Sequence, residues 1–134
     1  MKKKVAFVCT HNSCRSIMAE GWARHLGMDV IDAYSAGTEE NEKPKPMAIE
    51  VMVDAGVDMA HAKSKLLDAL PQGIDILVTM GCGVICPFVL CKHREDWWLT
   101  DPSGGPKSDY EETRDLIKAK VLLLIDRIKK GEFD

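Results

Sequence analysis

The chain has 134 residues, of which 46% are hydrophobic and 29% charged, a composition that suits one soluble domain with a single core. No apolar run approaches the roughly 20 residues of a membrane span, and the run after the N-terminal lysines is shorter than a signal-peptide core of about 7–15 residues. The formal net charge of -3 argues against a nucleic-acid partner, which normally requires a basic face. We therefore expect a cytoplasmic monomer with neither a membrane nor nucleic acid as its partner.

The first third of the chain predicts a strand, a helix and a second strand. Residues 4–9 are an apolar run rich in Val and Phe, typical of a central strand buried on both faces. A helix is expected from Ser16, because apolar residues follow at helical spacing, and Gly27 supplies its stop. A second strand is expected over residues 30–34, ended by the small residues 35–37.

The remainder continues the alternation of helices and strands. Helices are expected over residues 46–56, where a proline suits the first turn, and over 64–71. A strand is expected over 74–80 and a short one over 97–99, with a charged run before it that reads as a solvated loop. The last helix is expected over 109–129 from its apolar stripe.

This order predicts a single α/β domain over residues 1–134, with a four-stranded parallel sheet flanked by helices on both faces. Active sites in such sheets lie beyond the carboxyl ends of the strands. Cys9, Ser35, Cys82 and Asp101 all follow the predicted strands closely. We therefore expect these four side chains to meet at one edge of the sheet.

The segment between the first strand and the first helix has the composition of an anion-binding loop. Its backbone N–H groups would converge at the helix N-terminus, and Arg15 would add a bidentate fork for a tetrahedral oxyanion. The same positive potential would activate Cys9 as a nucleophile, with Ser16 hydrogen-bonded to its sulfur. The residues expected to surround the anion are Thr10, His11, Asn12, Ser13, Cys14, Arg15 and Ser16. The alternative is a strand-end cysteine with an unrelated arginine nearby.

Nucleophilic attack on an oxyanion also requires a proton donor for the departing oxygen. Asp101 precedes a proline that restricts its backbone, and glycines follow that would let the loop close over the site. We expect Asp101 to be this acid, although an Asp-Pro pair alone is usually only a turn.

Together these motifs resemble the low-molecular-weight tyrosine phosphatase family, and more closely its relatives, the thioredoxin-coupled arsenate reductases. The similar blocks occur in order and cover nearly the whole chain: VCTHNSCRSIMAEGW, YSAGT, AIEVMVDAGVD, LVTMGCG and DPSG. The anion loop alone does not separate a phosphatase from a reductase. A reductase needs thiols as a source of two electrons, and the second cysteine cluster at 82, 86 and 91 offers them.

The resemblance implies a mechanism for arsenic detoxification that needs no cofactor. Cys9 would attack arsenate, with Arg15 balancing its charge and Asp101 protonating the departing oxygen. Cys82 would then attack the sulfur of Cys9, which releases arsenite, and Cys86 would attack Cys82. The final disulfide would be presented to thioredoxin or to a small-thiol reductant.

The cysteine spacing departs from the family pattern. Only three residues separate Cys82 from Cys86, and Cys91 is an additional thiol that could take the place of Cys86. The Cys86-Pro87 pair favours Cys86, because it matches the family. Cys14 reads as a packed thiol, with a backup disulfide to the nucleophile as the alternative.

Members of the family also bind potassium near the anion loop. The matching positions here are Asn12, Glu20 and Ser35, but Lys65 stands where the family often has an aspartate. The lysine ammonium would neutralise Glu20 directly. We therefore expect no requirement for potassium.

Three rival interpretations stay open. Cys82, Cys86, Cys91 and His93 have a spacing that could form a Cys3His metal site, although it lacks the tight pairs of common zinc modules. A phosphatase would use the same anion loop without the second cysteine cluster. An arsenic-binding sensor without turnover is the third, and no DNA-binding motif supports it.

Overall fold

The structure, a computed structural model, describes residues 2–10, 12, 14–38, 43–81 and 89–134. Its four strands form a parallel sheet in the order β2-β1-β3-β4. They are β1 (Lys3–Cys9), β2 (Ile31–Gly37), β3 (Ile74–Thr79) and β4 (Cys91–Asp96). The helices are α1 (Arg15–Leu26), α2 (Pro46–Asp54), the 3-10 turn η1 (Leu67–Ala69) and α3 (Lys107–Lys129). The predicted four-stranded parallel sheet is confirmed.

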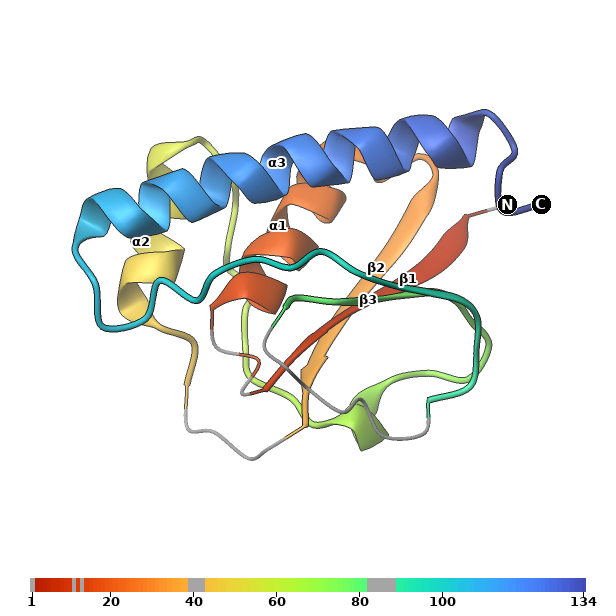
Figure 1. Cartoon of the computed structure of the whole chain (residues 1–134), viewed down its shortest axis with the longest axis horizontal. Helices are drawn as coiled ribbons and strands as arrows, with labels where there is room; N and C mark the ends of the chain where they lie inside the picture. The colour runs from red at the N-terminus through yellow and green to blue at the C-terminus, as the bar shows by residue number, and fades with distance from the viewer. Residues whose placement is uncertain (1, 11, 13, 39–42, 82–88) are drawn as a thin grey trace.

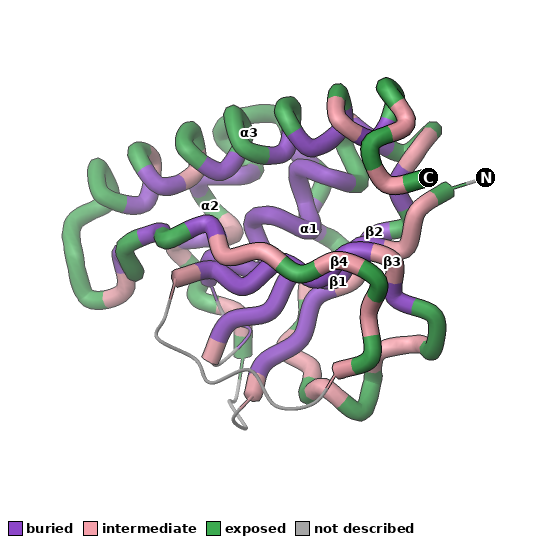
Figure 2. Tube along the Cα trace, turned by 45° about the vertical axis from the view of Figure 1, so that its right-hand side comes forward, coloured by how far each residue is buried: buried purple, intermediate pink, exposed green. Residues whose placement is uncertain are grey.

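The main core lies between one face of the sheet and the three α-helices, which pack against one another (Figure 1). Phe7 of β1 is fully buried there against Trp97, and α3 contributes Ile117, Val121 and Leu124 at helical spacing. Figure 2 shows the resulting pattern, in which β1, β2, β3 and α1 are mostly buried, β4 is partly exposed, and α3 alternates between buried and exposed positions. The apolar stripe that predicted α3 is therefore the stripe that it buries.

The opposite face of the sheet carries less helix than the sequence predicted. In the described part of the chain, a smaller apolar cluster around Ala6 and Leu77 is covered by Leu67 and Leu70 at η1 and by Val89. The helix expected over residues 64–71 is reduced to one 3-10 turn. Within the described residues, the prediction of helices on both faces therefore holds with α1, α2 and α3 on one face and only the 3-10 turn η1 on the other.

The last strand differs most from expectation. The charged run Cys91–Asp96 forms β4, whereas the residues expected to form a strand, 97–99, lie beyond its end. As the outer strand, β4 pairs only with β3, so its charged side chains reach solvent while its backbone still bonds inward. The interpretation of residues 92–96 as a solvated loop is therefore wrong. No helix in the described residues is long and apolar enough to span a membrane.

Candidate active site

The carboxyl ends of the sheet strands meet the N-terminus of α1 at one edge of the molecule. β1 ends at Cys9 and α1 begins at Arg15, so only a short connection separates the end of the strand from the start of the helix. The first turn of α1 contains no acidic residue and has no side-chain cap. The first backbone N–H groups of any α-helix have no partner inside the helix, and here no side chain caps them. Together with the helix dipole, these N–H groups favour an anion at this end.

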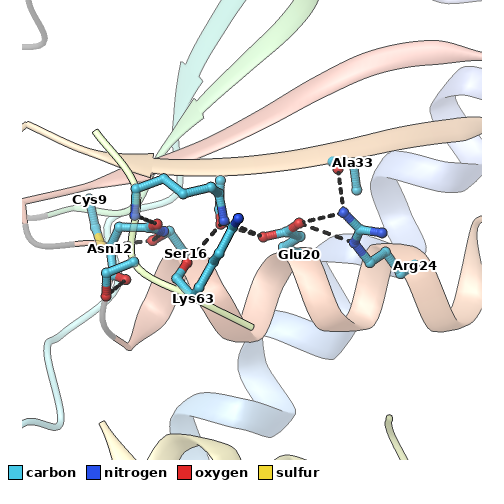
Figure 3. Close-up of polar contacts among 10 residues, drawn as sticks. Cys9, Asn12, Ser16, Glu20, Arg24, Ala33 and Lys63 are labelled. Atoms are coloured by element: carbon cyan, nitrogen blue, oxygen red, sulfur yellow. Dashed lines mark hydrogen bonds and ion pairs between the residues drawn. The ribbon is translucent and has the colours of Figure 1, made fainter. Parts of the chain in front are cut away.

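A buried chain of hydrogen bonds connects the nucleophile to the loop. The Asn12 amide donates to the Ser16 hydroxyl oxygen at 2.8 Å, and that oxygen lies 2.9 Å from the Cys9 sulfur (Figure 3). Because the hydroxyl oxygen already accepts from Asn12, its own hydrogen is free to point at sulfur. With the hydroxyl as donor, this contact would stabilise a Cys9 thiolate, which is the role predicted for Ser16 from the sequence.

Asn12 holds the loop to a distant segment. Its backbone is in the left-handed region, at φ 52°, where asparagine is tolerated better than most residues. Its side-chain oxygen accepts from the Lys65 backbone N–H at 2.8 Å, and its carbonyl accepts from the Ser64 hydroxyl at 2.9 Å. Asn12 is therefore tied to residues 64–65, which lie outside the loop.

Arg15 is buried and held by two backbone carbonyls. Its Nη1 donates to Met80 O and to Leu99 O, each at 2.8 Å, and its Nη2 lies 3.7 Å from the Asp101 carboxylate. With Nη1 fully used, Nε and Nη2 are the donors that remain for an oxyanion. The guanidinium thus joins the end of β3 to the segment that leads to Asp101.

Asp101 lies at the same edge with its carboxylate half exposed. Partial burial raises its pKa, but hydrogen bonds from the Ser103 backbone and side chain, and the charges of Arg15 and Lys45, outweigh burial and hold the pKa below its ordinary value. The Ser103 N–H donates to the carboxylate at 3.0 Å. Asp101 is therefore ionised at neutral pH in the unliganded protein.

Cys14 lies in the same loop but has the properties of a packed thiol. Burial first, and then the nearby charges of Asp101 and Cys9, raise the pKa of Cys14 to about 12. Because the thiolate is the form that attacks a disulfide or an electrophile, this raised pKa disfavours reaction at Cys14 near neutral pH. This favours the packed-thiol interpretation over the backup disulfide.

Of the four positions expected at a cation site, Ser35 and Lys65 contact Glu20, which is 3% exposed on α1, and Asn12 bonds the Lys65 backbone. Ser35 donates to this carboxylate, the Lys65 ammonium lies 3.6 Å from it, and Arg24 binds it through Nε at 3.0 Å and Nη2 at 2.8 Å (Figure 3). Lys65 also donates to the Lys63 carbonyl at 3.0 Å. Two protein cations thus already neutralise Glu20.

The cysteines of the second cluster divide between two places. Cys82 and Cys86 lie outside the described residues, as do His11 and Ser13 of the loop. Cys91 is described, and it pairs with Ile74 at the start of β3, whereas β1 pairs with Thr79 near its own end. Because Cys9 follows the residue that pairs with Thr79, Cys91 lies about six residues, or about 20 Å at a rise of about 3.3 Å per residue, along the strands from Cys9.

Of the four residues of the alternative Cys3His metal site, only Cys91 and His93 lie within the described residues. His93, on β4, hydrogen-bonds Glu95 at 2.8 Å and packs against Phe133. Within the described residues, no group of three or more His, Cys, Asp or Glu is placed to hold a metal ion, but two of the four candidate ligands lie outside those residues.

Sequence reasoning missed several partners in the site. The anchors of Arg15 are backbone carbonyls, which carry no residue signature, and they lie 65 and 84 positions away. Arg24 was detectable, because it stands four residues after Glu20 on the same helix face. Ser103 was also detectable, since a serine two residues after an aspartate is a common turn partner.

Nearly the whole chain is similar to known proteins of one family. A model of the family described as "Low molecular weight phosphotyrosine protein phosphatase" matches residues 4–132. An arsenate reductase of Staphylococcus aureus is 39% identical over 124 residues, 90% of this chain and 94% of that protein. Arsenate reductase 2 of Staphylococcus epidermidis is 37% identical over 127 residues, with the same coverage of both proteins.

Solved structures agree with these relatives. One described as an arsenate reductase in the phosphate binding state has a TM-score of 0.86 and 38% identity, covering 94% of this chain and 98% of that one. A thioredoxin-dependent arsenate reductase of Corynebacterium glutamicum has a TM-score of 0.79 and 28% identity, covering 97% of this chain and 63% of that one.

Proposed function

The chain belongs to the low molecular weight phosphotyrosine protein phosphatase family, and from this premise we propose that it is an arsenate reductase that converts arsenate to arsenite with its own thiols. One observation carries the proposal: the Cys9 thiol contacts Ser16 in the first turn of α1, which Arg15 begins, in a chain 39% identical to an arsenate reductase. The relative solved in a phosphate binding state supports a tetrahedral oxyanion as the ligand of this loop.

The first step is attack of the Cys9 thiolate on arsenic. Nε and Nη2 of Arg15 and the N–H groups of the α1 N-terminus hold the oxyanion and balance its charge. An arsenic–oxygen bond breaks as the sulfur–arsenic bond forms. Asp101, in its protonated form, gives a proton to the departing oxygen, which leaves as water.

The second step moves two electrons to arsenic. Cys82, which follows Gly81 at the end of β3, attacks the sulfur of Cys9, and the sulfur–arsenic bonding pair leaves on arsenic as arsenite. Cys86 then attacks Cys82, which frees Cys9 and leaves a Cys82–Cys86 disulfide. The position of Cys91 at the far end of the strands supports Cys86 as the resolving thiol.

The remaining disulfide must be reduced by an external thiol donor. The thioredoxin-dependent relative supports thioredoxin, with a small-thiol reductant as the other candidate. Since this chemistry needs free thiols, we propose that the protein acts in the reducing cytoplasm. All three cysteines of the proposed cycle lie in one chain, so we propose that it acts as a monomer.

The direct test couples arsenate to thioredoxin, thioredoxin reductase and NADPH. The proposal predicts NADPH oxidation that depends on arsenate, with one arsenite formed per NADPH consumed. Hydrolysis of p-nitrophenyl phosphate together with no arsenate-dependent oxidation of thioredoxin would instead identify a phosphatase. Slow hydrolysis alongside arsenate reduction fits the proposal, because the same anion loop serves both reactions.

The role of Asp101 predicts a pH-dependent effect of Asp101→Asn. Because the pKa of Asp101 is lowered, its protonated form is scarce at neutral pH and increases as the pH falls. The ratio of wild-type to variant kcat/KM for arsenate should therefore rise from pH 8 to pH 5, with a loss of about a hundredfold at neutral pH. The control is Asp126→Asn on α3. A ratio that does not change with pH would contradict a proton-donor role.

The Glu20 cluster predicts that potassium is not required. Values of kcat/KM measured in sodium and potassium buffers of equal ionic strength should agree within about twofold, because Lys65 and Arg24 already neutralise the carboxylate. The variant Lys65→Ser should gain activation by potassium, whereas Lys63→Ser, which leaves the Lys63 backbone carbonyl in place, should not. Strong potassium activation of the wild-type protein would rule out this assignment.

A further inference from the structure

Trp98 combines exposure with an unfavourable backbone. Its side chain is 81% exposed, whereas Trp22 and Trp97 are buried. Its φ is 53°, in the left-handed region that favours glycine, and the only other described non-glycine residue there is Asn12. The Trp98 side chain packs little against its own chain, so it contributes little to the stability of the fold. A strained backbone at such a residue points to a function, such as contact with a partner.

The turn that carries Trp98 is held rigidly. The Asp96 carboxylate accepts from the Trp98 N–H at 2.6 Å and from the Thr79 hydroxyl at 2.7 Å. Gly81 lies against the turn so closely that a side chain at position 81 would collide with the backbone of Trp98 and Leu99. Trp98 is therefore placed directly beside the residue that precedes the redox cysteine Cys82.

A groove of about 340 Å³ runs from this turn to α3 and is lined by Asp101 as well as Trp98. Leu116 lines it from α3 and is 51% exposed, and Leu123, seven residues further along the same face, is 62% exposed. Glu112 also lines the groove and forms no ion pair within the described residues. Apolar anchors beside an unpaired carboxylate suit a protein partner with an apolar rim and a basic residue.

We propose that Trp98 and Leu116 form the docking surface for the protein dithiol that reduces this enzyme. The inference rests on the proposed function, which requires a donor to reach the segment after Gly81. Among the exposed large apolar residues of the described chain, Trp98 lies in the turn that packs against Gly81. In the reaction, the two thiols of the donor become a disulfide while the enzyme disulfide returns to two thiols, so two electrons and two protons pass between them.

The test uses Trp98→Gly, a substitution that the positive φ accepts without strain. With thioredoxin as the donor, its kcat/KM for thioredoxin should fall about tenfold, because an exposed tryptophan anchor is lost. Arsenate reduction in a single turnover, driven by the thiols of the enzyme itself, should keep its wild-type rate. Leu116→Ser should show the same pattern with a smaller loss, about threefold.

The control is Met28→Ser, which removes another exposed apolar side chain, 66% exposed beyond the end of α1. It should retain wild-type kcat/KM for thioredoxin. Wild-type kcat/KM in Trp98→Gly, with single-turnover reduction intact, would overturn the docking surface alone. A matching loss of single-turnover reduction would also overturn it, by placing Trp98 in the arsenate site. If arsenate oxidises no thiols in the wild-type protein, the proposed function fails and this inference fails with it.

Discussion

The variant Arg15→Lys is expected to lose about a hundredfold to a thousandfold in kcat/KM for arsenate, as when an oxyanion donor is removed from an active site. Lysine provides one compact ammonium in place of a planar fork, so it cannot bind the Met80 and Leu99 carbonyls and also present two donors to the oxyanion. Leaving a buried carbonyl unpaired should also lower the free energy of unfolding by about 1–3 kcal/mol.

The matched control is Arg114→Lys, because Arg114 of α3 also donates to a backbone carbonyl, but to that of Val51 on α2. It should change stability modestly and leave kcat/KM for arsenate within about twofold. Steady-state kinetics and thermal unfolding of both variants check the prediction. If Arg15→Lys kept a third or more of the wild-type kcat/KM, the guanidinium would not be the main oxyanion ligand.

The variant Cys82→Ser is expected to abolish arsenite production, because it removes the thiol proposed to attack the sulfur of Cys9. Hydrolysis of p-nitrophenyl phosphate should survive in this variant, since water rather than a second thiol completes that reaction. Measuring both activities on one preparation separates loss of the redox step from loss of the anion site.

The chain provides a matched control in Cys91→Ser, which makes the same chemical change at the opposite end of the strands. This variant should keep near-wild-type arsenate reduction. Loss of activity in Cys91→Ser that equals the loss in Cys82→Ser would mean that the resolving thiol had been assigned to the wrong cysteine.

The order of the elements and the edge of the sheet that holds the site could be predicted from the sequence. Short apolar runs and helical stripes report on burial directly, and parallel strands must place their carboxyl ends together. Cys9 and Ser16 could be paired in advance because a loop of fixed length joins a strand to a helix N-terminus. The hydrogen bond between their side chains needs no long-range contact.

Features that depend on long-range contacts could not be predicted. The sequence of β4 is charged, whereas the pattern that predicts a buried strand is apolar. An outer strand can carry charged side chains because it is held by backbone hydrogen bonds to one neighbour, here β3. The anchoring of Arg15 depends on carbonyls brought together by two separate strand ends. The further bond from Arg24 to the Ala33 carbonyl depends on how β2 packs against α1.

The most direct test of the account is a single turnover of the fully reduced protein with arsenate and no external thiol, followed by mass-spectrometric mapping of disulfides. We predict one equivalent of arsenite and one disulfide per protein, between Cys82 and Cys86, with Cys14 and Cys91 still free. No arsenite, or a disulfide that includes Cys91 in place of Cys86, would contradict the mechanism proposed here.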